Sequence, residues 1–153
     1  MSKLIMMCGV PGSGKSTWIK NNYSDIAPVS RDAIRFEILD ERGGEYFDYE
    51  DEVFESFIHQ IIVSLAVDEI TIADATHLTK KARAKVLNKV ANFADEVEAI
   101  VMDVHLATAL ERNDMREGRA FVPRGVIRRM YFQMETPTRE EGFDKITFIR
   151  EDD

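Results

Sequence analysis

Cysteine and long apolar runs are scarce in this sequence. Its 153 residues include a single cysteine, Cys8, so an internal disulfide is impossible and a cysteine-based zinc site lacks ligands. The longest apolar run, around IIVSLAV, falls well short of the roughly 20 residues of a membrane span and is expected to be the buried face of a helix. Because no basic and apolar leader precedes the first expected strand, we expect a cytoplasmic protein without membrane contacts.

Basic residues are also few relative to acidic ones. The sequence has 20 Lys and Arg residues and 28 Asp and Glu residues, so the net charge is −8. Proteins that coat duplex nucleic acid need a broad basic surface, so that class is excluded, whereas a small basic pocket is not. Repeats, low-complexity tracts and Pro/Gly/Ser-rich linkers are missing as well. We therefore expect one domain over residues 1–153.

The strongest motif is GVPGSGKST, residues 9–17. It fits the pattern G-x-x-x-x-G-K-[ST], whose glycines allow positive φ and bring backbone N–H groups close to phosphate oxygens. An expected strand at 3–8 precedes it and an expected helix follows, which is the order that phosphate binding at a helix N-terminus requires. The lysine can reach the outer phosphates of a nucleotide, and the serine hydroxyl can ligate magnesium. The predicted nucleotide-binding residues are Gly9, Pro11, Gly12, Ser13, Gly14, Lys15, Ser16 and Thr17.

Strand and helix patterns alternate along the rest of the chain. Further strands are expected at 26–29, 69–74, 96–104 and 145–149, and helices at 31–39, 50–67, 79–92, 107–117 and 124–135. Alternation of this kind is typical of parallel βαβ units. We predict an α/β P-loop NTPase fold, a three-layer sandwich around a parallel sheet of about five strands. Ligands of such sheets lie beyond the carboxyl ends of the strands.

Three acidic and basic residues fall at those ends. Asp74 closes the strand EITIAD, as expected of an acid that acts on magnesium or its bound water, although it could simply cap a turn. Asp32 and Arg35 are three residues apart at a helix start, so they share one face. The carboxylate could take a proton from an acceptor hydroxyl while the guanidinium binds a phosphate of the acceptor. The alternative is an ion pair without a catalytic role.

The segment RNDMREGRAFVPRG is rich in arginine: it contains Arg112, Arg116, Arg119 and Arg124. A mobile segment at about residues 112–125 could close over the nucleotide as a lid, exclude water and place a cation on the developing charge. The alternative is a solvated helix with an ordinary loop. For His77, shortly after Asp74, a hydrogen-bonded structural role is expected.

Four stretches together resemble the P-loop polynucleotide 5'-hydroxyl kinases, typified by the kinase half of the T-even phage polynucleotide kinase-phosphatase. They are GVPGSGKSTW, SRDAIR, IADATHL and ERNDMREGRAFVPRGVIRRMY, in that order and at comparable spacing. The resemblance spans most of the chain. It implies a nucleotide-kinase-like fold with a lid, ATP and Mg²⁺ as cofactors, and a single-stranded nucleic acid 5'-OH end as substrate.

Residue roles follow from the resemblance. It implies that Lys15 and Ser16 bind the ATP phosphates and magnesium, that Asp32 is the general base, that Arg35 binds the 3'-phosphate of the acceptor, and that Arg116 is the lid arginine on the donor phosphates. Asp74 and Thr76 would belong to the metal or acceptor site, and Arg112 to the nucleotide site. The sequence departs from the family at Thr76, where an amide side chain is usual, and after Arg116, where the segment is one residue longer.

We therefore predict an ATP-dependent kinase that transfers the γ-phosphoryl group to a polynucleotide 5'-hydroxyl. One alternative is a small-molecule kinase of the nucleotide, nucleotide-sugar or zeta-toxin type, which the acidic composition favours. Another is a nucleotide-dependent switch that binds ATP without an acceptor. The sequence leaves RNA or DNA preference and homo-oligomer formation open.

Overall fold

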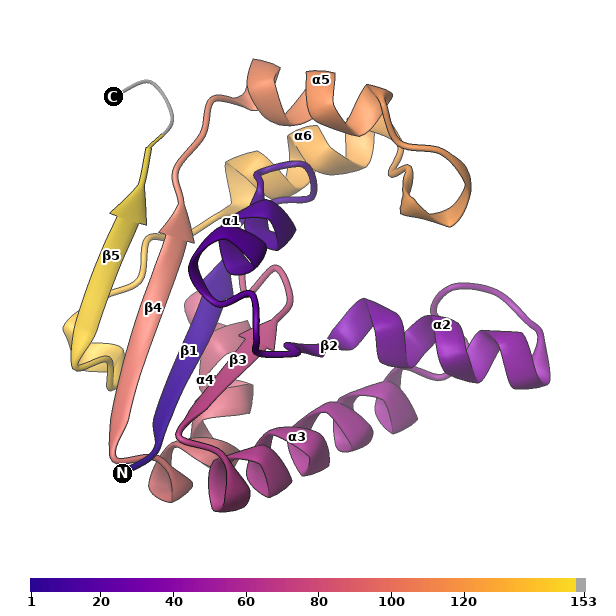
Figure 1. The fold of residues 1–153 in the computed structure, drawn as a ribbon. Coiled ribbons are helices and arrows are strands. Elements are labelled where there is room, and N and C mark those ends of the chain that lie inside the picture. Colours follow the sequence, from indigo (N-terminus) through magenta and orange to yellow (C-terminus); the bar gives the residue numbers. More distant parts are fainter. Residues whose placement is uncertain (151–153) are drawn as a thin grey trace.

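A five-stranded parallel sheet forms the centre of the protein (Figure 1). The computed structural model describes residues 1–150. The strand order is β2-β3-β1-β4-β5, and every neighbouring pair is parallel. The strands are β1 (Lys3–Cys8), β2 (Val29–Ser30), β3 (Ile70–Asp74), β4 (Glu96–Met102) and β5 (Lys145–Ile149). The predicted α/β sandwich with about five parallel strands is confirmed.

In the described part of the chain, six α-helices and three short 3₁₀-helices connect the strands. No helix within residues 1–150 is both long and apolar enough to cross a membrane. The α-helices are α1 (Lys15–Asn22), α2 (Arg31–Arg42), α3 (Glu50–Val67), α4 (Lys80–Val90), α5 (Leu106–Asp114) and α6 (Arg124–Gln133). The 3₁₀-helices are η1 (Ala91–Phe93), η2 (Gly118–Ala120) and η3 (Arg139–Glu141).

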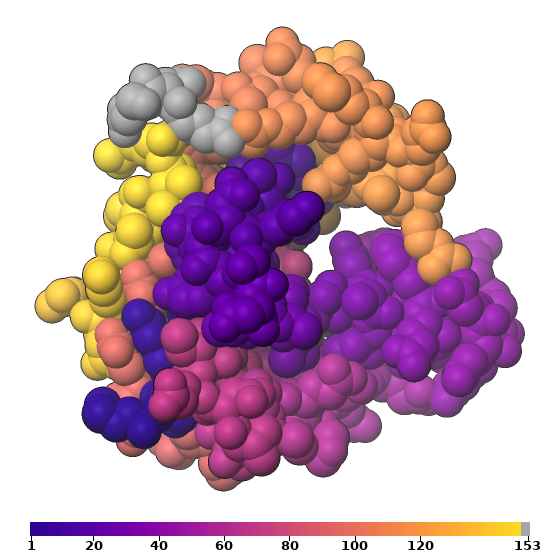
Figure 2. Space-filling model, in the orientation of Figure 1, coloured from indigo at the N-terminus to yellow at the C-terminus, as the bar shows by residue number. Residues whose placement is uncertain are grey.

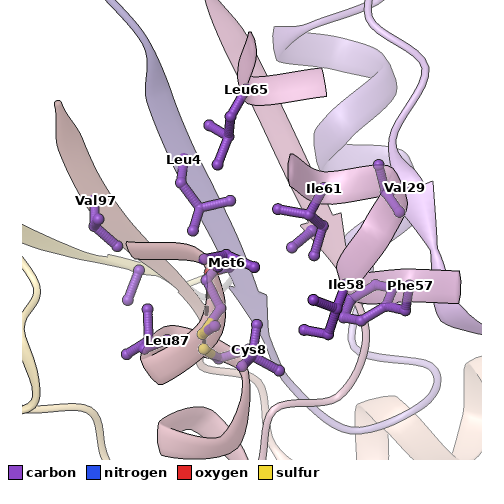
Figure 3. Packing of buried hydrophobic residues seen from close by; sticks show 14 of the residues in the cluster. Leu4, Met6, Cys8, Val29, Phe57, Ile58, Ile61, Leu65, Leu87 and Val97 are labelled. Carbon is purple, nitrogen blue, oxygen red and sulfur yellow. Dashed lines mark hydrogen bonds between the residues drawn. The ribbon is translucent and has the colours of Figure 1, made fainter. Parts of the chain in front are cut away.

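Alternating side chains of β1 face opposite sides of the sheet, as the pleat of a strand requires. Leu4, Met6 and Cys8 pack with α3 and α4, where Phe57, Ile61 and Leu87 are among their partners (Figure 3). Ile5 and Met7 belong to the other layer, where they pack with Ile19 of α1. These β1 side chains are fully buried, so Cys8 is a core residue.

The chain leaves β1 at a topological switch point, because β1 lies between β3 on one side and β4 on the other. In open parallel sheets such a point forms a crevice for ligands at the carboxyl ends of the strands. Helices α5 and α6 lie above this end, and α2 projects from the side (Figure 1). A third apolar cluster supports this end of the molecule: Val10, Val104, Ala109, Leu110 and Ile127.

Several expected boundaries were wrong by one to three residues, and two of the differences have a clear physical reason. The strand expected at 26–29 is the two-residue strand β2, because Pro28 has no N–H to donate and pairing with Ala73 and Asp74 begins at Val29. The helix expected to reach residue 117 ends at Asp114, where Arg116 N–H donates to the Asn113 carbonyl at 3.0 Å and turns the chain. Ser30 caps α2, since its hydroxyl accepts from Ala33 N–H at 3.1 Å.

Candidate functional site

The loop from Gly9 to Ser16 leaves β1 and runs into α1 through two residues of positive φ. Gly12 has φ of +85° and Gly14, the N-cap of α1, has φ of +97°. A Cβ atom on Gly12 would also lie 2.4 Å from the Ala109 carbonyl oxygen of α5. Glycine is therefore required at residue 12 both for its backbone conformation and for the close approach of α5. This is the loop geometry that the motif predicted.

Lys15 reaches back over this loop. Its ammonium group donates to the carbonyl oxygens of Gly9 at 2.7 Å and Val10 at 3.2 Å. Burial lowers the pKa of Lys15 to about 8, while the negative charges of Asp74 and Asp32 oppose this shift and the positive charge of Arg116 adds to it. Lys15 therefore lies within electrostatic range of both acids and of Arg116.

Ser16 and Asp74 line one pocket of about 210 Å³, whose other walls include Ile19, Tyr23 and Ile26. Burial raises the pKa of Asp74, and the positive charge of Lys15 acts against it. Within residues 1–150 no group of three or more His, Cys, Asp or Glu side chains could hold a metal. One hydroxyl and one carboxylate fit Mg²⁺, which keeps several waters and takes further oxygens from substrate phosphates.

The segment from Thr76 to Arg83 is tied to β1 and the loop after it. The Thr76 carbonyl accepts from Gly9 N–H at 2.9 Å, and His77 Nδ1 lies 2.6 Å from the Met7 carbonyl oxygen. Because a carbonyl only accepts, Nδ1 carries the proton. Burial lowers the pKa of His77 to about 4. Arg83 Nη1 also donates to the His77 carbonyl at 2.9 Å. His77 is therefore buried and hydrogen-bonded on both its ring and its backbone, which agrees with the structural role expected of it.

Asp32 and Arg35 lie at the start of α2 and contact each other, as their spacing predicted. The Asp32 side chain is 62% exposed, whereas Arg35 is only 6% exposed. Arg35 Nη1 donates to Asp32 Oδ1, and Nη2 donates to both carboxylate oxygens of Glu50, at 2.5 and 2.8 Å. Tyr46 donates to Asp32 Oδ1 at 2.8 Å. An acceptor phosphate could reach Nη2 only by replacing Glu50.

Sequence reasoning missed Tyr46 and Glu50 as parts of this site. Glu50 lies at the start of α3, where an acid is expected to favour the helix dipole, and Tyr46 lies in the loop before it. They are 11 and 15 residues from Arg35, but α2 ends at Arg42, so no single helix or strand carries all three. Only the packing of α3 against α2 brings them together, and no local pattern could have shown it.

The lid segment begins with two hydrogen bonds that close a loop. The Asn113 amide donates to the Val122 carbonyl at 2.5 Å, and its carbonyl oxygen accepts from Val122 N–H at 2.9 Å. Arg112 lies half-buried in the last turn of α5. Arg116 is exposed, and its Nη1 donates to the Ala120 carbonyl at 3.4 Å.

The far end of the lid reaches α2. Arg119 donates to both carboxylate oxygens of Asp40, at 2.6 and 3.3 Å, and its guanidinium lies 4.7 Å from the ring centre of Phe36. In the space-filling view the lid, in orange, spans from α5 to α2, in purple, and a hollow lies between them and α1, in indigo (Figure 2). This hollow, the cleft, lies between the segments that carry the phosphate-binding loop, the start of α2 and residues 112–125, and the charges of Asp74, Asp32 and Arg116 all act on Lys15.

The cleft combines the groups that phosphoryl transfer needs. Backbone N–H groups and Lys15 can hold phosphates, Ser16 and Asp74 can hold magnesium, and Asp32 offers an exposed carboxylate. Pro11 lies half-buried in the loop, and Thr17 is exposed on the first turn of α1. The roles proposed for single residues remain predictions.

A protein-family model described as an AAA domain, AAA_33, matches residues 4–137. Among solved structures, a chain of the Pnkp1/Rnl/Hen1 RNA repair complex is 23% identical with a TM-score of 0.70, over 86% of this chain and 43% of that chain. A sugar kinase from Janibacter sp. is 16% identical with a TM-score of 0.65, over 98% and 86% of the two chains.

A gluconokinase from Sinorhizobium meliloti 1021 is 20% identical with a TM-score of 0.59, over 97% of this chain and 82% of that chain. At these identities the structural likeness shows the fold alone. The chain spans less than half the length of the RNA repair chain that it matches.

Proposed function

Because the chain belongs to the AAA_33 family of AAA domains, we propose that it is an ATP-dependent kinase whose acceptor is the 5'-hydroxyl of a polynucleotide end. The observation that carries this proposal is the exposed Asp32 carboxylate, which shares the cleft with Lys15 and Asp74 and is held by Arg35. A switch that only bound nucleotide would have no use for a base at this place.

In the proposed reaction the acceptor oxygen gives its proton to Asp32 and forms a bond to the γ-phosphorus. The bond from that phosphorus to the β,γ-bridging oxygen breaks, and ADP leaves with both electrons. Lys15, the loop N–H groups and Arg116 offset the negative charge on the transferred group. Bound magnesium would supply further positive charge to the phosphate oxygens, held by Ser16 and Asp74.

The polynucleotide acceptor is supported by the SRDAIR element and by the likeness in fold to a chain of an RNA repair complex. In this proposal Arg35 holds the phosphate 3' to the terminal nucleoside through Nη2, after Glu50 has moved away. Nη1 stays on Asp32. A guanidinium suits this task because Nη2 can bind the phosphate while Nη1 keeps its bond to Asp32, which a single ammonium group does not reproduce.

A small-molecule kinase is the second candidate, and one observation favours it. Arg35 is neutralised by Glu50 and Asp32, so the pocket around it suits an uncharged acceptor such as a sugar. The sugar kinase and the gluconokinase of similar fold agree with this candidate.

Labelled ATP incubated with a mixed panel of acceptors tests the proposal. The panel contains a 5'-OH oligonucleotide, a nucleoside 3'-phosphate, a nucleoside, a nucleotide and a sugar, each with the parent and with Asp32→Asn. We expect label at the oligonucleotide 5' end, and a loss of about 10² to 10⁴ in turnover for Asp32→Asn at little changed ATP affinity. Label on the sugar alone would favour the second candidate, and ATP consumption without any acceptor would indicate the switch.

A further inference from the structure

Tyr46, Asp32 and Arg35 form a triangle in which each side chain is hydrogen-bonded to the other two. The Tyr46 hydroxyl accepts from Arg35 Nη1 at 2.9 Å and donates to Asp32 Oδ1 at 2.8 Å. The Arg35 guanidinium also lies 4.3 Å from the centre of the Tyr46 ring. One side chain from the loop between α2 and α3 thus contacts both members of the pair that the proposed reaction uses.

The loop holds Tyr46 in place. Two glycines of positive φ, Gly43 at +72° and Gly44 at +106°, take the chain away from the end of α2. The ring then packs edge-on against Phe36 and Phe47, at centroid distances of 6.1 and 4.6 Å. Although Tyr46 is 41% exposed, its contacts with Phe36, Phe47 and the Arg35 guanidinium orient the ring so that its hydroxyl meets Asp32.

The hydroxyl must act as a donor to Asp32. Burial and the charge of Asp32 raise the pKa of Tyr46 to about 12, so the phenol keeps its proton at neutral pH. Arg35 has no acceptor atom and occupies a lone pair of the phenol oxygen. The phenol proton is therefore directed at Asp32 Oδ1.

The two oxygens of Asp32 consequently differ. Oδ1 accepts from both Arg35 and Tyr46, whereas Oδ2 has no hydrogen bond to any residue of the described range 1–150. A carboxylate free to rotate would present either oxygen at many angles. Two donors on Oδ1 fix the plane of the group and reserve Oδ2 for the incoming hydroxyl, as a general base requires.

We propose that Tyr46 is a positioning residue that fixes the Asp32 carboxylate so that Oδ2 meets the acceptor hydroxyl. The inference rests on the proposed kinase function, in which Asp32 is the base. It does not depend on whether the acceptor is a polynucleotide or a small molecule, because the hydroxyl is common to both.

Tyr46→Phe tests this, since it removes the hydroxyl and keeps the ring. We expect kcat to fall by about tenfold, the size typical of one hydrogen bond to a charged group, with KM for ATP and for the acceptor within about twofold of the parent. The matched control is Tyr49→Phe, which removes a hydroxyl at the end of the same loop, where the ring lies against Arg42 and not against Asp32 or Arg35. It should keep the parent kcat.

A double-mutant cycle separates positioning from a general structural role. In single-turnover measurements, Tyr46→Phe should lose its effect when Asp32→Asn is already present, because its only route to the reaction is through that carboxylate. An undiminished effect in the Asp32→Asn background, or equal kcat for Tyr46→Phe and the parent, would overturn the proposal. A parent that phosphorylates no hydroxyl in the panel would instead refute the kinase function, and this inference with it.

Discussion

At the scale of single residues, the charge of Lys15 depends strongly on its surroundings. Its pKa, lowered to about 8 by burial, means that it loses its proton within the working range of many assays. We expect the affinity for ATP to fall as the pH rises above about 8, by up to tenfold per pH unit, because only the charged form attracts phosphate.

Calorimetric titration with ATP at pH 7, 8 and 9 measures this effect. Lys15→Arg is the control, since a guanidinium keeps its charge and should show no such fall. Lys15→Ala should abolish transfer and leave the unfolding temperature near that of the parent, because the loop contributes little to the core. Constant ATP affinity of the parent from pH 7 to 9 would contradict the prediction that Lys15 loses a phosphate-binding charge in this range.

His77 gives a prediction about stability. Its pKa is about 4 in the folded protein and near 6.5 when unfolded. Between these values the unfolded chain binds a proton that the folded chain does not, so the free energy of unfolding falls as the pH drops from about 6.5 to about 4. The loss attributable to His77 is on the order of 3 kcal/mol, at roughly 1.4 kcal/mol per pKa unit.

Urea unfolding of the parent and of His77→Asn across this pH range measures the difference. Asparagine tolerates the positive φ of +44° at this residue and does not titrate. The variant should be less stable at pH 7 and should lose less stability on acidification than the parent. Parallel curves for the two proteins would mean that His77 is not the group responsible.

At the scale of elements, the lid offers two arginines with different surroundings. The positive charge of Arg116 lowers the pKa of Lys15, whereas Arg119 forms an ion pair with Asp40 of α2. We expect Arg116→Ala to lower kcat by about 10² to 10³, as for other groups that stabilise developing charge. Arg119→Ala should change kcat by only a few fold, because exposed ion pairs contribute roughly 0.2–1 kcal/mol.

Steady-state kinetics with the two variants, at saturating ATP, makes the comparison. Both side chains are exposed, so neither substitution should alter the unfolding temperature by more than a few degrees. Equal kcat losses would indicate that lid closure as a whole, rather than the Arg116 charge, supports the reaction.

Sequence patterns predicted most elements because each depends on local features. The Gly-rich loop, the Ser30 cap and the apolar stripe of α3 act within one or two turns of the chain. Contacts between distant segments could not be predicted in this way. The Glu50 and Tyr46 contacts to Arg35 depend on how α3 packs on α2, and the Arg119 pair with Asp40 joins residues 79 positions apart.

At the scale of the whole molecule, charge is distributed unevenly along the chain. Residues 31–69, which include α2 and α3, carry twelve carboxylates and three arginines. A nucleic acid strand that left the cleft over these helices would be repelled. The terminal nucleotide and its 3'-phosphate should therefore supply most of the acceptor affinity, and longer oligonucleotides should add little.

The central claim, a polynucleotide 5'-OH acceptor held through its 3'-phosphate, is tested most directly by one comparison. It is kcat/KM for a nucleoside, its 3'-phosphate and a short 5'-OH oligonucleotide, in the parent and in Arg35→Lys. We expect the parent to use the 3'-phosphate and the oligonucleotide about 10- to 100-fold better than the nucleoside, and Arg35→Lys to lose most of that ratio, whatever it does to the absolute rates. Equal use of nucleoside and 3'-phosphate by the parent, or activity on a sugar alone, would contradict the account.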